Sequence, residues 1–290
     1  MTNLLQQVFN GLVAGSFYAL LALGLAVIFG MLKVVNFAHG VVYMLGAFGA
    51  YLLLTQGGMP FWVALPVVPL LLWAVGMVVE RLLVRRLVSL DPIYNLLLTY
   101  GLALVVEGVF RVMFGVSSQP YAAPKGLRGT LDLGLFQYPA YPVFVFGISV
   151  LTCLVVWYLL AQTRVGVVIR AATERPELTR ALGIDVARWI TPVFGFGVGL
   201  AGFAGVLAAP TRSVNPVMGS TVIIIVFAAV VIGGMGSIFG SVVAAYAIGI
   251  IQQLGNVYVP LLSQVLVFII MALVLLVRPA GLFGREEAAL

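Results

Sequence analysis

Apolar residues run along this chain in blocks of about twenty, separated by short polar or charged gaps. A helix needs about 20 apolar residues to cross the hydrocarbon core of a bilayer. The pattern therefore predicts membrane-spanning helices. Six blocks are clear in the first part of the chain: 8–31, 34–57, 60–79, 92–114, 139–162 and 190–210.

The stretch between Arg212 and Arg278 contains no charged residue. As a single helix it would be about 98 Å long, roughly three times the thickness of a bilayer core. It must therefore fold back on itself, and Gly and Pro residues mark natural breaks near 233–237 and 255–260. We predict further spans at 217–236, 238–254 and 260–277. The total is about nine membrane segments, or eight if one of these three is re-entrant.

Composition supports this fold class, because 63% of the residues are hydrophobic and only 8% are charged. Soluble domains are typically about 45–50% apolar and about 25% charged. We therefore predict an all-α polytopic membrane protein, with residues 1–290 forming one transmembrane domain. Cys153 is the only cysteine, so no intrachain disulfide can form. The first apolar run is expected to be a retained span and not a signal peptide.

The basic residues predict the orientation, because cytoplasmic loops carry an excess of Lys and Arg. With the N-terminus outside, eleven of the 15 basic residues face the cytoplasm. These are Lys33, Arg81, Arg85, Arg86, Arg164, Arg170, Arg175, Arg180, Arg188, Arg278 and Arg285. The other four are Arg111, Lys125, Arg128 and Arg212. The C-terminus is then cytoplasmic, loop 115–138 is external and loop 163–189 is internal. The net charge of +6 reflects this orientation and not nucleic-acid binding.

The sequence lacks the motifs of several enzyme classes. Neither Lys33 nor Lys125 is followed by Ser or Thr, so there is no P-loop. His39 is the only histidine, which excludes an H-E-x-x-H zinc site, and no G-x-S-x-G motif accompanies it. We predict no catalytic residue, no metal ligand and no cofactor bound by this chain. Transport, channel or scaffold functions remain.

Some polar residues fall inside the apolar blocks, where they are costly and usually functional. Glu107 and Arg111 lie four residues apart, on one face of a helix. They form an ion pair near the outer boundary, or else Glu107 faces a water-filled path. Asn36 and His39 begin the second block, where they either bridge helices or serve the path. The candidate residues of the path or gate are Asn36, Phe37, His39, Tyr43 and Glu107.

The inner loop predicts a short helix over residues 174–182. Thr173 is the expected N-cap, Pro176 is tolerated in the first turn, and Gly183 suits the end of the helix. An apolar stripe follows from the spacing of Leu178, Ala181 and Leu182. The stripe packs on the chain's own helices or on lipid headgroups, or it docks into a groove of a cytoplasmic partner.

Several segments together resemble the permease subunits of bacterial branched-chain amino acid ABC importers, most of all the LivH type. The resemblance runs almost from end to end, and each motif is weak by itself. It rests on G-S-F-Y-A-L-L-A-L-G-L (15–25), I-F-G (28–30), N-F-A-H-G (36–40), R-A-A (170–172), L-G-I (182–184), G-G-M-G-S (233–237) and R-P-A-G-L-F-G (278–284).

The resemblance implies a type II importer-like fold and transport of branched-chain amino acids into the cytoplasm. It also implies the partners: a second homologous permease, two cytoplasmic ATPases that bind ATP and magnesium, and an external substrate-binding protein, all at the bacterial inner membrane. The residues matching the ATPase-coupling loop are Arg170, Ala171, Ala172, Glu174, Leu178, Leu182 and Gly183. The alternatives are a permease for urea or a short amide, and an ATP-independent secondary carrier. A related urea permease often has another residue at Phe37, which favours amino acids.

Overall fold

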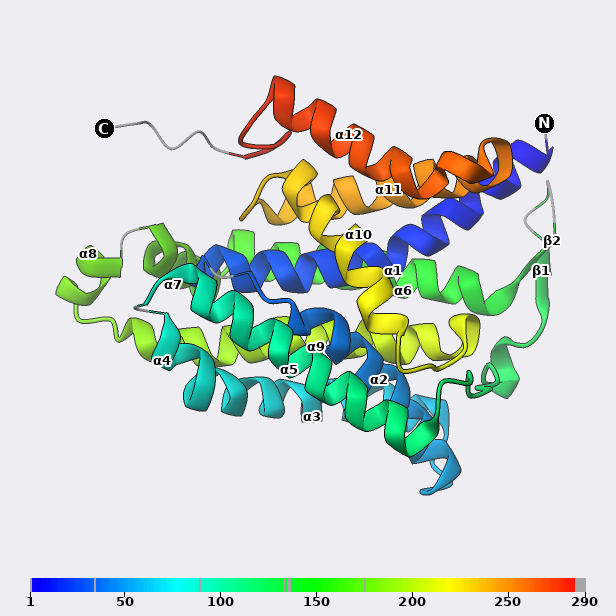
Figure 1. Ribbon diagram of the computed structural model, residues 1–290, viewed down its shortest axis with the longest axis horizontal. Coiled ribbons are helices and arrows are strands. Elements are labelled where there is room, and N and C mark those ends of the chain that lie inside the picture. Colours follow the sequence, from blue (N-terminus) through cyan, green and yellow to red (C-terminus); the bar gives the residue numbers. More distant parts are fainter. Residues whose placement is uncertain are drawn as a thin grey trace.

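The computed structural model describes residues 2–33, 35–88, 90–132, 134, 137–174 and 176–284. Arg175 and Arg285, which we predicted to face the cytoplasm, lie outside this part of the chain. Long apolar helices dominate the fold (Figure 1). They are α1 (Thr2–Leu32), α2 (Ala38–Thr55), α3 (Phe61–Val79), α5 (Pro92–Phe114), α6 (Ala140–Gln162), α9 (Val186–Arg212), α10 (Met218–Gly233), α11 (Ile238–Tyr258) and α12 (Ser263–Val277).

Shorter elements lie between these helices. They are the π-helix η1 (Glu80–Val84), α4 (Arg85–Leu87), the 3₁₀ turns η2 (Lys125–Leu127) and η3 (Pro260–Leu262), the strands β1 (Thr130–Asp132) and β2 (Gln137–Pro139), and the helices α7 (Arg164–Glu174) and α8 (Pro176–Ala181). Helix α7 was not predicted.

Eight helical segments of the described chain are long and apolar enough to cross a membrane. This confirms an all-α multi-pass membrane protein. Helix α10 corresponds to the predicted span at 217–236, but its 16 residues extend only about 24 Å, less than the roughly 30 Å of a bilayer core. Helix α3 ends at Val79, the predicted end of the third span. The helical chain continues beyond it through η1 and α4 to Leu87.

The two ends of the molecule carry different elements (Figure 1). Helix α1 begins at the end that holds β1 and β2, and it runs toward the end that holds α7 and α8. Helix α11 returns toward the first end, and α12 runs back again. Residues after α12 pack on the turn between α10 and α11, where the Leu282 amide donates to the Ile232 carbonyl oxygen at 2.8 Å.

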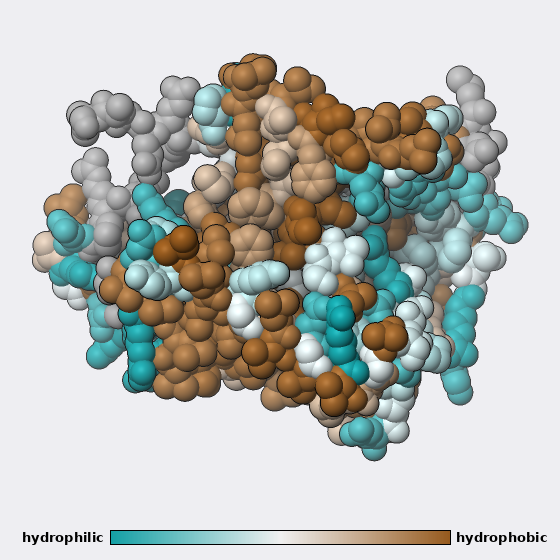
Figure 2. Space-filling model, viewed as in Figure 1, coloured by the Kyte–Doolittle hydropathy of each residue, from teal (hydrophilic) through white to brown (hydrophobic). Residues whose placement is uncertain are grey.

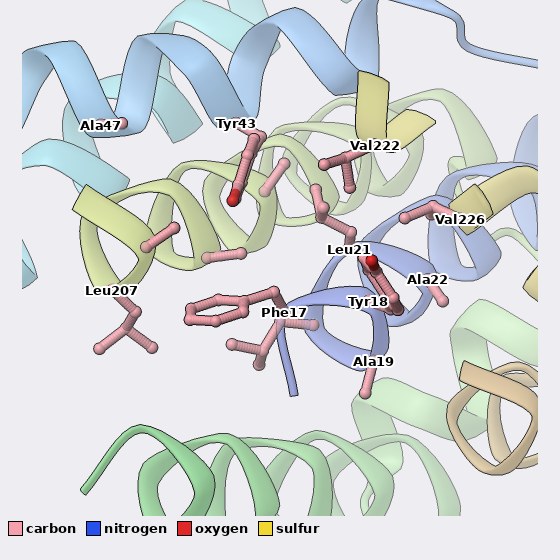
Figure 3. Packing of buried hydrophobic residues seen from close by; sticks show 14 of the residues in the cluster. Phe17, Tyr18, Ala19, Leu21, Ala22, Tyr43, Ala47, Leu207, Val222 and Val226 are labelled. Atoms are coloured by element: carbon pink, nitrogen blue, oxygen red, sulfur yellow. The ribbon is translucent and has the colours of Figure 1, made fainter. Parts of the chain in front are cut away.

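Helix α1 forms the centre of the core and packs mainly on α11, α9, α6 and α10, while α2 packs mainly on α9. Figure 3 shows part of this packing, including Phe17, Tyr18 and Leu21 of α1 beside Tyr43 of α2. Glycine allows the helices to approach closely. A Cβ atom on Gly11 of α1 would lie 2.6 Å from the Cα atom of Ile250 in α11. Gly11 therefore lets α1 and α11 pack closely together.

The loop 115–138 contains a short hairpin. Strands β1 and β2 pair antiparallel, with Leu131 opposite Tyr138. The Tyr138 ring packs edge-to-face on Phe9 at 4.8 Å, and its hydroxyl donates to the Asn10 side-chain oxygen. Burial raises the pKa of Tyr138, which keeps the phenol neutral as a donor. The hairpin is thereby attached to the start of α1.

The outer surface of the helices suits a bilayer. On the face drawn in Figure 2, apolar side chains cover the middle and polar side chains gather toward the two ends. In the most apolar stretch of α5 only 6% of the residues are buried, compared with 83% for α1. Helices α3, α5, α6 and α12 therefore form the periphery, and α1 lies inside.

Candidate functional site

The segment from Asn36 to Tyr43 joins α1 to α2 and begins α2. Phe37 stands just before α2, and its amide donates to the Thr99 hydroxyl oxygen of α5 at 3.2 Å. The Phe37 ring stacks on Phe227 of α10 with a centroid distance of 6.1 Å and meets Tyr100 edge-on at 6.3 Å. The segment therefore connects three helices.

His39 is fully buried between α1, α2 and α9. Its Nε2–H donates to the Leu21 carbonyl oxygen at 3.1 Å. The ring fits because Gly24 has no side chain: a Cβ atom there would lie 3.0 Å from His39 Cε1. In this conformation His39 bridges two helices and does not line an open path.

Several buried polar atoms of this region have no hydrogen-bond partner among the described residues. They are Asn36 Oδ1, His39 Nδ1, the Tyr43 hydroxyl and both side-chain polar atoms of Asn95 in α5. Leaving such groups unpaired costs free energy in a low-dielectric interior. The region therefore has unused hydrogen-bonding capacity that an internal water or another conformation would satisfy.

Glu107 and Arg111 form the predicted ion pair on α5, with Oε1 and Nη2 at 2.6 Å. The Glu107 side chain is 13% exposed and that of Arg111 is 47% exposed. Glu107 is far along α5 from the Asn95–Thr99 turn that touches Phe37. The structure therefore does not gather Glu107 with the other four candidate residues.

A second glutamate–arginine pair was missed by the sequence analysis. Glu80 Oε1 lies 3.0 Å from Arg85 Nε, and Thr191 of α9 donates its hydroxyl to Glu80 Oε2 at 2.7 Å. The Glu80 side chain is 1% exposed. Residues 80 and 85 were assigned to a loop, and the π-helix that aligns them leaves no clear signal in the sequence.

The inner loop folds differently from the prediction at its start. Thr173 lies inside α7 and Glu174 ends that helix, so the predicted N-cap was wrong and the second helix begins at Pro176. Helix α7 also carries Arg170, Ala171 and Ala172. The reason is that the R-V-G-V-V-I-R-A-A-T-E segment buries part of its own apolar face, including Ala172.

The predicted residues of the coupling loop are close together in space. Thr179 of α8 is buried and donates its hydroxyl to the Ala171 carbonyl oxygen of α7 at 2.9 Å. Arg170 donates to the Leu160 carbonyl oxygen at the end of α6. These contacts fix α8 against α7 and α7 against the end of α6.

Gly183 ends α8 as the sequence predicted, with φ of +83°. Its amide donates to the Arg180 carbonyl oxygen at 2.9 Å, and the Ile184 amide donates to the Thr179 carbonyl oxygen at 3.2 Å. These two bonds are those of a Schellman motif. Leu178 and Leu182 remain 54% and 81% exposed. The apolar stripe of α8 is therefore not covered by the described helices.

A polar cleft of about 450 Å³ lies toward the other end of the molecule, between α1, α10, α11 and α12. Its lining includes Tyr18, Arg212, Gln252, Gln253, Asn256 and Gln264. The sequence analysis did not single it out. A signal was present, because Gln252, Gln253 and Asn256 share one face of an otherwise apolar helix.

Comparison with known proteins adds a family match. The model of the family described as "Branched-chain amino acid transport system / permease component" matches residues 7–275. The chain is 32% identical to the high-affinity branched-chain amino acid transport system permease protein BraD of Pseudomonas aeruginosa. That similarity covers 98% of this chain and 96% of the relative.

Two Escherichia coli K12 proteins extend the comparison. The permease protein LivH of the high-affinity branched-chain amino acid transport system is 29% identical over 98% of this chain and 96% of its own. The permease protein LivM of that system is 26% identical over 94% of this chain and 69% of its own. No solved structure matches this chain.

Proposed function

Because this chain belongs to the family of permease components of branched-chain amino acid transport systems, we propose that it forms part of the membrane path of an ATP-driven importer. It passes branched-chain or closely related amino acids into the cytoplasm. The observation that carries this proposal is the family match, which extends over residues 7–275.

The proposed importer contains further subunits. The similarity to LivM supports a second, homologous permease paired with this one. ATP and magnesium bind to two cytoplasmic ATPase subunits, since this sequence has no P-loop. A periplasmic or extracellular binding protein delivers the substrate.

The proposed orientation places α7 and α8 in the cytoplasm and the start of α1 outside. Basic residues such as Arg164, Arg170 and Arg188 cluster in the segment that holds α7 and α8, which supports this orientation. The opposite end holds the β1–β2 hairpin (Figure 1). A reporter fused after Leu290 tests the orientation, because activity only on the periplasmic side would contradict it.

We assign α8 as the element that docks into an ATPase subunit. Its exposed stripe, Leu178 and Leu182, presents apolar side chains on a short helix held by Thr179 and closed by Gly183. A rigid helix with an unpaired apolar face fits a groove on a partner. Arg170, Ala171, Ala172 and Glu174 belong to α7, and the Ala171 carbonyl oxygen accepts the hydrogen bond that holds α8.

We assign Asn36, Phe37, His39 and Tyr43 to a gate that changes conformation during transport. The unpaired atoms of Asn36, His39 and Tyr43 support this, because another packing of the helices could satisfy them. Glu107 takes part from a separate position on α5. If Asn36→Ala and His39→Ala both assemble and transport normally, the gate assignment is wrong.

Uptake into vesicles tests the function as a whole. The chain is reconstituted with its co-purified permease, ATPases and binding protein, and radiolabelled leucine and urea are offered separately. We expect leucine to accumulate only with ATP and the loaded binding protein. Accumulation of urea instead, or leucine uptake without the ATPases, would favour one of the alternative functions.

The substitution Leu178→Asp tests the docking of α8. A charge buried without a partner in an interface costs several kcal/mol, so ATPase retention and leucine-stimulated ATP hydrolysis should fall. Gly183→Val should act similarly, because a β-branched residue is strained at φ of +83°. Glu177→Gln on the same helix is the control and should leave hydrolysis unchanged. Full coupled hydrolysis in Leu178→Asp would show that the ATPase docks elsewhere.

A further inference from the structure

The polar cleft between α1, α10, α11 and α12 combines three kinds of side chain. Arg212 supplies a cation, and Gln252, Gln253, Asn256 and Gln264 supply amides. Val222, Ile225 and Phe268 supply an apolar wall. The volume of about 450 Å³ lies within the range of small-molecule sites. Figure 2 shows polar side chains gathered beneath the apolar surface of α12, toward the end that carries the hairpin.

Arg212 is the last residue of α9 and is held over the aromatic rings of α1. Its guanidinium carbon lies 5.3 Å from the centre of the Phe17 ring and 5.7 Å from that of Tyr18. Among the described residues no carboxylate lies within ion-pair distance of it. The residue is exposed in the cleft. An exposed cation without an acidic partner is available to an anionic ligand.

The amides of the cleft are held by contacts within the chain. Tyr18 donates its hydroxyl to Gln252 Oε1 at 2.7 Å, and Gln253 donates to Gln7 Oε1 at 2.8 Å. Gln252, Gln253 and Asn256 lie on one face of α11. Each amide both donates and accepts hydrogen bonds. Their oxygens can receive an ammonium group while Arg212 holds a carboxylate.

We propose that this cleft is a substrate-binding site of the permease that takes an α-amino acid as its zwitterion. Arg212 binds the carboxylate, the α11 and α12 amides receive the ammonium group, and Val222, Ile225 and Phe268 contact an aliphatic side chain. A neutral substrate such as urea has no group that requires Arg212. This inference rests on the proposed function, because the cleft would be loaded from the binding protein.

Charge rescue at position 212 tests the site in the complete importer. Cys153 is the only cysteine of this chain, so Cys153→Ala provides the background. Adding Arg212→Cys should lower ATP-driven leucine uptake about tenfold or more, because a charged hydrogen bond is lost. Treatment with 2-aminoethyl methanethiosulfonate should restore uptake, and the neutral 2-hydroxyethyl reagent should not. Equal uptake before and after both treatments would overturn the proposal.

Protection separates contact with substrate from a structural role. The thiol at position 212 should react more slowly with the reagent when leucine-loaded binding protein and ATP are present than with the empty binding protein. Lys125→Cys, an exposed cation of the outer loop, is the matched control and should show no protection. Protection by phospholipid alone, with no effect of leucine, would assign Arg212 to a lipid headgroup and overturn the proposal.

The same variants distinguish a failure of the proposed function from a failure of the cleft assignment. If the Cys153→Ala importer with Arg212 intact does not transport leucine, the proposed function itself fails. If that importer transports leucine and Arg212→Cys does so at the same rate, only the cleft assignment fails.

Discussion

Two glutamate–arginine pairs lie in membrane helices of this chain, and they differ in almost every respect except composition. Glu107 and Arg111 are four residues apart on the peripheral helix α5 and form an ion pair with each other. Glu80 and Arg85 are five residues apart, and Thr191 of α9 joins them. The first pair belongs to one helix, whereas the second ties two helices together.

The π-helix explains the second pair. In an α-helix, residues three and four apart are neighbours on the surface. Between Glu80 and Val84 the chain forms a π-helix instead, and the Arg85 amide donates to the Glu80 carbonyl oxygen. Bonds of this kind bring residues five apart onto the same face. The Arg85 side chain can therefore reach Glu80, which is buried against α9.

From this difference we expect that burial and attachment to a second helix, more than charge, decide how much an ion pair contributes to the stability of the fold. Glu80 is shielded from water and holds the end of α3 to the first turns of α9. That contact lies directly after the loop that contains α8. The Glu80 pair therefore connects the proposed docking helix to the core.

Removing Arg85 should have the largest effect. Arg85→Gln leaves the Glu80 carboxylate buried without its cation, which costs about 3–5 kcal/mol of stability. The melting temperature of the detergent-solubilised protein, followed by loss of the folded peak on gel filtration, measures the change. Arg86→Gln changes an exposed neighbour and is the control. Equal melting temperatures in the two variants would contradict the importance of the buried pair.

Removing the hydrogen bond between α9 and Glu80 should have an intermediate effect on stability. Thr191→Val keeps the shape of the side chain and deletes the hydroxyl that donates to Glu80 Oε2. A hydrogen bond to a charged group contributes about 1.5–3 kcal/mol. The same melting assay applies, and Thr55→Val, an exposed site, should change little. An unchanged melting temperature in Thr191→Val would mean that Arg85 alone stabilises Glu80.

The peripheral pair should have the smallest effect. Arg111→Gln removes a contact within one helix turn near the outer end of α5, and such pairs contribute about 0–1 kcal/mol. A double-mutant cycle of Glu107→Gln with Arg111→Gln should therefore give a smaller coupling energy than Glu80→Gln with Arg85→Gln. If the α5 pair has the larger coupling energy, Glu107 must be buried by another subunit of the importer.

The sequence by itself determined the positions of the membrane helices and the end of α8. Blocks of apolar residues predict spans because backbone groups must be satisfied within a helix inside lipid. Glycine at position 183 predicts the left-handed end of α8 because other residues are strained there. Both properties are local, so they can be read from consecutive residues.

Only the tertiary structure decided which side chains of different helices meet. Glu80 reaches Thr191, Tyr18 reaches Gln252, and Arg212 reaches Phe17 across long separations in the sequence. Hydropathy reports how apolar a segment is, but it does not report which face of a helix meets which neighbour. That choice depends on the close approach of glycine-rich helices and on one π-helix, since each shifts the directions of side chains without changing the apolar pattern.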